Sequence, residues 1–144
     1  MNVGSVMAGA VETVAPDTSV EDVARIMAKA EVGSVPVTED GLLAGIVTDR
    51  DLVVRVLAEG RDPRSVTAGE VASTDVVTVG PDRPLAEARE LMARNQIRRL
   101  PVVDEGRLVG ILALGDIAVQ DDAEQATGEA LEEISRSPAT ESRG

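Results

Sequence analysis

The chain carries an internal duplication that contains no gap. A shift of 65 positions lays residues 14–53 onto residues 79–118. The clearest matches are Val35-Pro36-Val37 on Leu100-Pro101-Val102 and Gly45-Ile46-Val47 on Gly110-Ile111-Leu112. Such repetition predicts two copies of one structural unit, related by a pseudo-twofold axis. An axis of this kind creates paired clefts between the copies, and such clefts are natural places for small molecules.

Composition limits both the core and the chemistry. The chain has 144 residues, of which 43% are hydrophobic, but it has no Phe, Tyr or Trp. One core of ordinary size is therefore expected, and a bound ring would have to lie between aliphatic side chains and backbone. The absence of His and Cys excludes imidazole bases, thiolate nucleophiles and most zinc, copper or haem ligation. An enzyme is the least favoured class of function.

The formal net charge of -12 constrains the partners. A surface this acidic repels nucleic acid and anionic lipid, so we expect neither as a partner. No apolar stretch is long enough to span a bilayer, and no charged leader followed by an apolar run opens the chain. The expectation is a soluble, cytoplasmic protein.

Each copy has the pattern β-α-β-β-α, which predicts an α+β fold. The expected elements are 11–14, 19–30, 32–38, 42–47 and 49–59 in the first copy, and 76–79, 85–95, 99–104, 108–112 and 115–119 in the second. Pro36 indicates an edge strand or a bulge, because proline cannot donate to a ladder. Asp40-Gly41 predicts a hairpin turn.

These elements suggest four regions along the chain. Residues 1–60 form the first repeat with an N-terminal segment, 61–65 a linker, 66–120 the second repeat, and 121–144 an acidic C-terminal helix or tail. A turn or short helix is expected at 66–72. The tail has a thin apolar stripe at Ala130, Leu131 and Ile134.

The strongest local motif runs from Gly45 to Asp51. Thr48 followed three residues later by Asp51 is typical of a capping box at a helix start. In the second copy Ala113 replaces Thr48 while Asp116 persists, so capping explains the pair less well, although the helix dipole also favours Asp116. The functional alternative is that each carboxylate accepts two hydrogen bonds from a vicinal diol such as ribose, with phosphate at the helix start.

Arg98 and Arg99 enter an apolar strand of a very acidic chain. One structural interpretation places one of them in solvent and the other beside a carboxylate. The functional interpretation is a phosphate clamp, because the guanidinium fork suits phosphate geometry. The first copy has Gly33 and Ser34 at these positions, which offer close backbone approach and a hydroxyl instead. The two clefts are therefore expected to differ.

Over about residues 3–120, the chain resembles a pair of cystathionine-β-synthase-type (CBS) domains, a Bateman module. The resemblance rests on the β-α-β-β-α order, the tandem copies, the Leu-Pro-Val strand and the Gly-Ile-Val-Thr-Asp-Arg-Asp element. The stretch from Thr48 to Arg55 is also similar to small stand-alone bacterial CBS pairs of the hypoxic-response type. The His and Cys residues that could bind metal in some relatives are absent from this chain.

The resemblance implies that both clefts bind adenosine-containing ligands: AMP, ADP, ATP, S-adenosylmethionine or NAD-type molecules. It implies that Asp51 and Asp116 hold ribose hydroxyls and that Thr48 touches ribose or phosphate. The residues implied for the first cleft are Thr48, Asp51, Ser34, Val76, Val77, Ile97 and Arg98. Those implied for the second are Asp116, Arg98, Arg99, Thr13, Val14, Val32 and Gly33. Ala113 argues against affinity in the second cleft, whereas its Arg pair argues for a phosphorylated ligand.

We therefore expect a regulatory adenine-nucleotide-binding module that has no catalysis of its own and signals to a separate protein in trans. The resemblance implies a flat homodimer that buries helix faces near Leu52–Val56 and Ile117–Val119. The alternative is a structural or interaction dimer with degenerate or empty clefts. Asp49, Asp51 and Asp116 leave a divalent-cation site open, but we expect Mg²⁺ only together with ATP.

Overall fold

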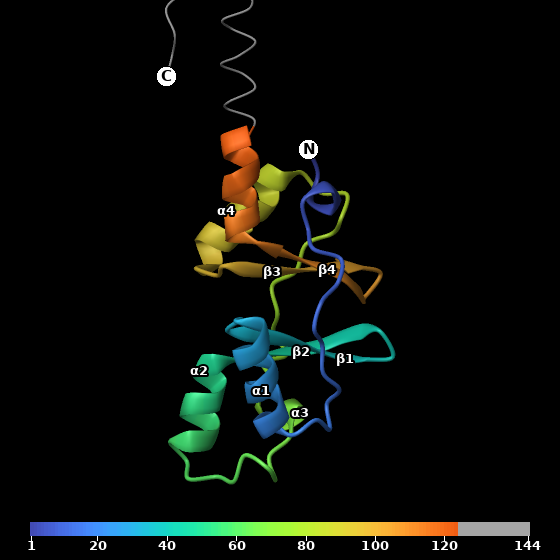
Figure 1. The fold of residues 1–144 in the computed structure, drawn as a ribbon. Helices are drawn as coiled ribbons and strands as arrows, with labels where there is room; N and C mark the ends of the chain where they lie inside the picture. Colours follow the sequence, from blue (N-terminus) through green and yellow to red (C-terminus); the bar gives the residue numbers. More distant parts are fainter. Residues whose placement is uncertain (124–144) are drawn as a thin grey trace, which may run out of the picture.

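Two β-hairpins face each other across the middle of the molecule, and the helices of each half lie on its outer side (Figure 1). This computed structural model describes residues 1–123. The apolar stripe predicted at Ala130, Leu131 and Ile134 lies outside the described residues, as does most of the predicted C-terminal region.

Each half contributes the same elements in the same order, and the α+β class is confirmed. The first half contains α1 (Val20–Ala30), β1 (Ser34–Glu39), β2 (Leu42–Thr48) and α2 (Asp49–Leu52), which continues as a π-helical segment, η2 (Val53–Leu57). The second half contains α4 (Leu85–Asn95), β3 (Arg99–Asp104), β4 (Arg107–Ala113) and a helix at 114–123. Two short helices, η1 (Val3–Ser5) and α3 (Ala68–Val71), precede the halves.

The strands form one antiparallel sheet in the order β1-β2-β4-β3, so β1 and β3 are its edges. Pro36 therefore lies in an edge strand, and the register of β1 shifts between Val37 and Thr38, as the proline predicted. The hairpin turns have positive φ at both central residues, 54° and 82° at Asp40 and Gly41. This conformation matches the twist of the strands and explains the Asp-Gly sequence.

The joint between the two hairpins is narrow. Strands β2 and β4 are in register at one residue pair, Leu42 with Arg107. The Leu43 N–H donates to the Gly106 carbonyl at 3.0 Å, and the Leu108 N–H donates to the Gly41 carbonyl at 3.1 Å. The shift of 65 residues converts each of these two bonds into the other, so the pseudo-twofold axis passes through this joint.

The strands expected at 11–14 and 76–79 are reduced to single parallel bridges, Val14 with Val37 and Val79 with Val102. The Val14 N–H donates to the Pro36 carbonyl at 3.1 Å, and the Thr38 N–H donates to the Val14 carbonyl at 2.9 Å. The next bond of a parallel ladder would need an N–H on Pro36. Because proline has none, the ladder ends after one residue.

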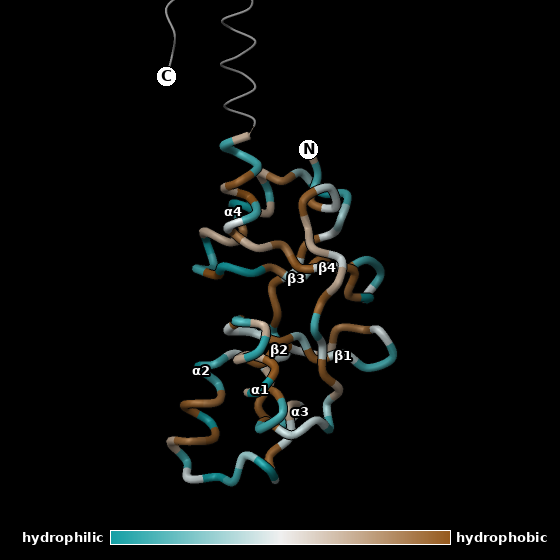
Figure 2. The backbone as a smooth tube through the Cα atoms, viewed as in Figure 1, coloured by the Kyte–Doolittle hydropathy of each residue, from teal (hydrophilic) through white to brown (hydrophobic). Residues whose placement is uncertain are grey.

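Two separate hydrophobic cores form, one in each half, and each borrows residues from the segment that precedes the other repeat. Val66, Ala68 and Val71 are buried in the first core. Val3, from the N-terminal segment, is fully buried in the second core. Figure 2 shows hydrophobic positions along the central strands between the helical layers. Each of these segments therefore packs on the half that does not follow it in the chain. This packing connects the two halves, although their strands share one residue pair.

Among residues 1–123, no helix combines the length and apolar character needed to cross a membrane.

Candidate functional site

A cleft of about 550 Å³ opens between the two halves, and we call it the larger cleft. It is lined by Gly33, Ser34, Ile46, Thr48, Asp49, Asp75, Val76, Val77, Asn95, Ile97, Arg98, Arg99 and Pro101. Six of the seven residues predicted for the first cleft are among them; the seventh, Asp51, is not. A volume of this size is typical of pockets that bind drug-sized molecules.

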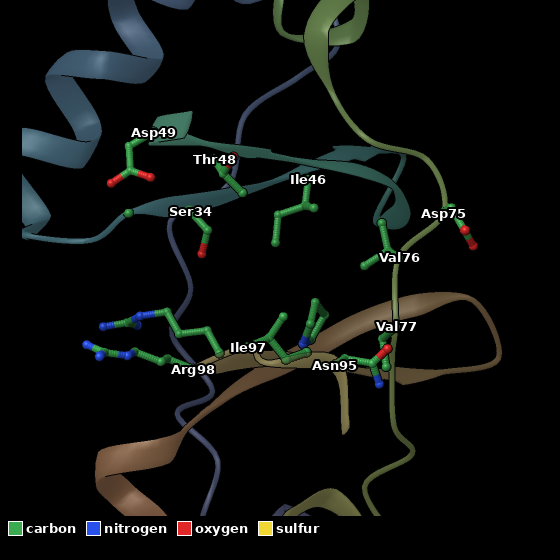
Figure 3. A pocket seen from close by; sticks show the side chains of 13 residues that line it. Ser34, Ile46, Thr48, Asp49, Asp75, Val76, Val77, Asn95, Ile97 and Arg98 are labelled. Carbon is green, nitrogen blue, oxygen red and sulfur yellow. The ribbon is translucent and has the colours of Figure 1, made fainter. Parts of the chain in front are cut away.

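The middle of the larger cleft is aliphatic. Figure 3 shows Ile46 on β2 directed toward Ile97, which precedes β3, across the gap between the hairpins. Val76 and Val77, from the segment that links the repeats, close one side. Such walls suit a flat, weakly polar ring. Because the chain has no aromatic residue, a bound ring was expected to lie between aliphatic side chains.

One end of the larger cleft is polar. Ser34 and Asp49 approach from the first half, and the Arg98 side chain extends below them from the second (Figure 3). Within residues 1–123, the guanidinium groups of Arg98 and Arg99 make no hydrogen bond or ion pair. Most other described arginines pair with a carboxylate, as Arg25, Arg61, Arg64, Arg83, Arg89 and Arg94 do. The predicted pairing of one of these arginines with a carboxylate is thus absent here.

Asp51 is held by its own helix start. The Thr48 N–H donates to Asp51 Oδ2 at 2.9 Å, and the Asp51 N–H donates to Thr48 Oγ1 at 3.1 Å. The other carboxylate oxygen lies 3.7 Å from Arg55 Nε, and the side chain is 12% exposed. The capping box is therefore formed in the first copy, while Thr48 itself lines the cleft.

Asp49 occupies the place near the cleft that the sequence assigned to Asp51. Its N–H donates to the Gly33 carbonyl at 2.9 Å, which brings the helix start against residue 33. An added Cβ on Gly33 would lie 3.0 Å from Asp49 Oδ2, so a larger residue here would require the Asp49 side chain to move. Gly33 was predicted for the second cleft but lines the larger one. The position of Asp49 directly after Thr48 was the signal available in the sequence.

A second, smaller cleft of about 180 Å³ is related to the larger one by the pseudo-twofold axis. Its lining residues are Ala8, Ala10, Val11, Glu12, Ala30, Val32, Ser34, Pro36, Arg99, Ile111, Ala113 and Asp116. Of the residues predicted for it, Val32, Arg99 and Asp116 line it, whereas Thr13, Val14, Gly33 and Arg98 do not.

The misplaced residues in the smaller cleft have a simple cause. Val14 belongs to the first core and is 6% exposed, because its backbone bridges β1. Subtracting 65 from Val76 and Val77 gives Val11 and Glu12, which are the residues that line the smaller cleft. The repeat itself therefore contained the correct assignment.

Asp116 differs from Asp51 in its surroundings. Ala113 offers no hydroxyl, and within residues 1–123 the Asp116 carboxylate forms no hydrogen bond or ion pair. Asp116 is exposed and lines the smaller cleft. The loss of the threonine thus frees the carboxylate that the capping box holds in the other copy.

Comparison with known proteins gives a consistent result. The family model described as CBS domain matches residues 3–58 and 68–120. The CBS domain-containing protein YhcV of Bacillus subtilis is 44% identical over 93% of this chain and 95% of its own length. Hypoxic response protein 1 of Mycobacterium tuberculosis is 38% identical over 82% of this chain and 79% of its own length. The resemblance predicted from the motifs is confirmed.

Solved structures share the fold. The crystal structure of CBSX2 in complex with AMP has a TM-score of 0.76 and 28% identity, covering 86% of this chain and 98% of that one. The CBS domain pair of protein MJ0100, in complex with 5-methylthioadenosine and S-adenosyl-L-methionine, has a TM-score of 0.74 and 26% identity, covering 86% and 98%.

Proposed function

The chain belongs to the CBS-domain family as a tandem pair, and on this premise we propose that it is a regulatory module that binds a phosphorylated adenosine derivative in the larger cleft. The observation that carries the proposal is the larger cleft itself, with an aliphatic middle and two arginines that have no acidic partner at its end. AMP, ADP and ATP are the ligands that combine a flat ring with phosphate. The AMP complex of CBSX2 supports this ligand class.

The unpaired arginines are the part of the site that favours phosphate. The chain has 26 acidic residues and 14 basic ones, yet among the described residues neither Arg98 nor Arg99 has a carboxylate partner. Charge-assisted hydrogen bonds from guanidinium to phosphate are about twice as strong as neutral ones. Ser34 faces Arg98 across the cleft and can donate a further hydrogen bond from its hydroxyl (Figure 3).

The narrow joint between the hairpins supports a regulatory role. The larger cleft is lined from both halves, whose strands are in register at a single residue pair. A ligand that contacts Ile46 on one side and Arg98 on the other therefore favours one relative arrangement of the halves. The mechanism is a shift of population that a separate protein detects in trans.

The homodimer is part of the same proposal, and side-chain exposure defines its surface more closely. Val56 and Ile117, which lie in the predicted helix faces, are each 2% exposed and belong to the two cores. The apolar side chains left exposed on the same helices are Val53, Val54 and Leu57 in the first half and Leu114 and Val119 in the second. We expect these residues to meet a second copy of the chain.

The second candidate is an interaction dimer whose clefts bind nothing. It is favoured by the capping box, which occupies the Asp51 carboxylate, and by Ala113, which removes the hydroxyl from the second copy. It would keep the exposed apolar surface of the helices and lose the ligand.

One experiment separates the two candidates. Because the chain has no aromatic residue, its own absorbance near 260 nm is close to nil. Gently purified protein that carries nucleotide will show a purine band, and stripped protein will show a rise in melting temperature with AMP, ADP or ATP. The absence of both effects, with S-adenosylmethionine also inactive, would contradict the proposed function and leave the interaction dimer.

Within the site, Asp51→Ala and Asp116→Ala test the ribose assignment of each carboxylate separately. We expect the variant of the occupied cleft to lose affinity. Binding that survives both changes would show that neither carboxylate holds the ribose.

A further inference from the structure

The two clefts differ in the charge of their walls. The larger cleft is lined by two carboxylates, of Asp49 and Asp75, and by two guanidinium groups, so its formal charge is balanced. The Asp75 side chain points away from the centre of this cleft (Figure 3). The smaller cleft is lined by Glu12 and Asp116 against one guanidinium, that of Arg99, and has an excess of negative charge.

Among the described residues, Arg99 supplies the one positive charge of the smaller cleft, and it is shared between the clefts. Arg99 lines both clefts, as does Ser34, its equivalent under the 65-residue shift. A phosphate in the larger cleft attracts the Arg99 guanidinium toward it. The smaller cleft is then left with Glu12 and Asp116 and without any opposing charge among the described residues.

Glu12 is one of the positions at which the two clefts differ in charge. Its equivalent in the larger cleft is Val77, an uncharged side chain that is partly buried against the second core. Within residues 1–123, the Glu12 carboxylate has no hydrogen-bond or ion-pair partner. An unneutralised carboxylate in a cleft wall repels a phosphate dianion and tolerates a neutral or cationic ligand.

Size points the same way. At about 180 Å³, the smaller cleft is below the usual range of about 300–1,000 Å³ for sites that enclose a drug-sized ligand. A ligand without phosphate occupies less volume than its phosphorylated form.

We propose that the smaller cleft excludes phosphorylated ligands and accepts adenosine derivatives that carry no phosphate, and that Glu12 is the residue that sets this difference. The proposal rests on the proposed function, because it assumes that the larger cleft binds the phosphorylated form. The chain would then bind two chemically distinct ligands in the two clefts formed by its two copies of one unit.

A reciprocal exchange of the two equivalent residues tests the proposal by calorimetric titration with AMP. The wild-type chain should bind one AMP per chain, and Glu12→Val should bind a second. Glu12→Gln keeps the size of the side chain and removes its charge, so a second AMP in this variant would identify charge as the cause. Glu39→Gln, an exposed carboxylate on β1 that lines neither cleft, is the matched control and should leave one AMP per chain.

The opposite exchange, Val77→Glu, should weaken AMP binding in the larger cleft by about tenfold or more, because it adds an uncompensated carboxylate to a cleft wall whose formal charge is balanced. Val77→Gln has the same bulk, so the ratio of the two affinities reports charge alone. Val77 packs partly against the second core, and thermal melting of both variants shows whether they are folded. If Val77→Glu does not fold, the Glu12 variants still decide the question.

The outcomes are distinct. Two AMP molecules per wild-type chain with similar affinity would overturn the proposal, as would a single AMP in both Glu12 variants. Wild-type chains that take up adenosine at a second site but AMP at only one would support it. A wild-type chain that binds none of AMP, ADP and ATP contradicts the proposed function instead. AMP binding acquired by Glu12→Val would then still support the role of Glu12, and its failure would remove that role too.

Discussion

The two clefts have one backbone plan and different side chains. In the larger cleft the helix start is capped by Thr48, and Asp51 is held in the capping box. In the smaller cleft Ala113 provides no cap, and Asp116 is exposed at the wall. The comparison shows that, after duplication, a few substitutions at equivalent positions were enough to change the charge and volume of a site without altering the elements that build it.

The two cores allow the comparison to be tested on stability, where the largest effect is expected. Leu100 and Val35 are equivalent under the shift, and both are fully buried. Leu100→Ala should lower the free energy of unfolding by about 2–5 kcal/mol, and Val35→Ala by less, because it removes fewer buried carbon atoms. Urea unfolding measures both. Equal losses of unfolding free energy in the two variants would contradict the expected difference between the two cores.

The arginine that lines only the larger cleft provides the next test. Arg98→Ala should weaken AMP binding by at least about tenfold, since a hydrogen bond to a charged group contributes about 1.5–3 kcal/mol. Arg25→Ala is the control, because Arg25 pairs with Glu21 on the outer helix α1. Calorimetry with AMP gives both constants. An unchanged affinity in Arg98→Ala would remove Arg98 from the site.

The capping residues predict effects of opposite sign. Thr48→Ala removes a formed capping box and should cost about 1 kcal/mol of unfolding free energy in the ligand-free chain. Ala113→Thr supplies the missing hydroxyl opposite Asp116 and should stabilise the chain by a smaller amount. Thermal or urea unfolding of the two variants measures this. If Ala113→Thr destabilises the chain, the difference between the helix starts lies in the backbone and not in the cap.

The smallest expected effect concerns acid stability. A hydrogen bond from Arg83 holds the pKa of Glu87 below its ordinary range, and their positions correspond to Thr18 and Asp22 in the first copy. Because the folded pKa is lowered, the stabilisation is present above the ordinary carboxyl pKa and is lost as the pH falls through the lowered value.

Arg83→Thr copies the first repeat and should return the Glu87 pKa toward its ordinary range, as followed by NMR titration of the side chain. Both groups are exposed, so added salt should reduce the difference. A Glu87 pKa that does not move in this variant would assign the shift to another cause.

Much of the fold was accessible from the sequence, because hydrophobic periodicity and turn residues act locally. The limits of α4 and β3 match the prediction, and Pro36, which indicated an edge strand or a bulge, lies in an edge strand next to a register shift. The strands at 11–14 and 76–79 were overestimated, because their ladders depend on partner strands that lack an N–H at Pro36 and at Pro101, respectively. That dependence is tertiary and is invisible in the segment itself.

The site was predictable to a similar degree. The larger cleft collects Ser34, Ile97 and Arg98, as the resemblance implied. The errors came from side-chain placement: the capping box holds Asp51 while Asp49 lines the cleft. The exchange of segments also escaped prediction, because nothing local in residues 3–7 reveals that they pack on the second half.

The most direct test of the account is a crystal structure of the full chain grown with AMP. The account predicts one AMP per chain in the larger cleft, with its ring between Ile46 and Ile97 and its phosphate at Arg98. AMP bound elsewhere, or a larger cleft that stays empty in crystals whose protein binds AMP in solution, would contradict it.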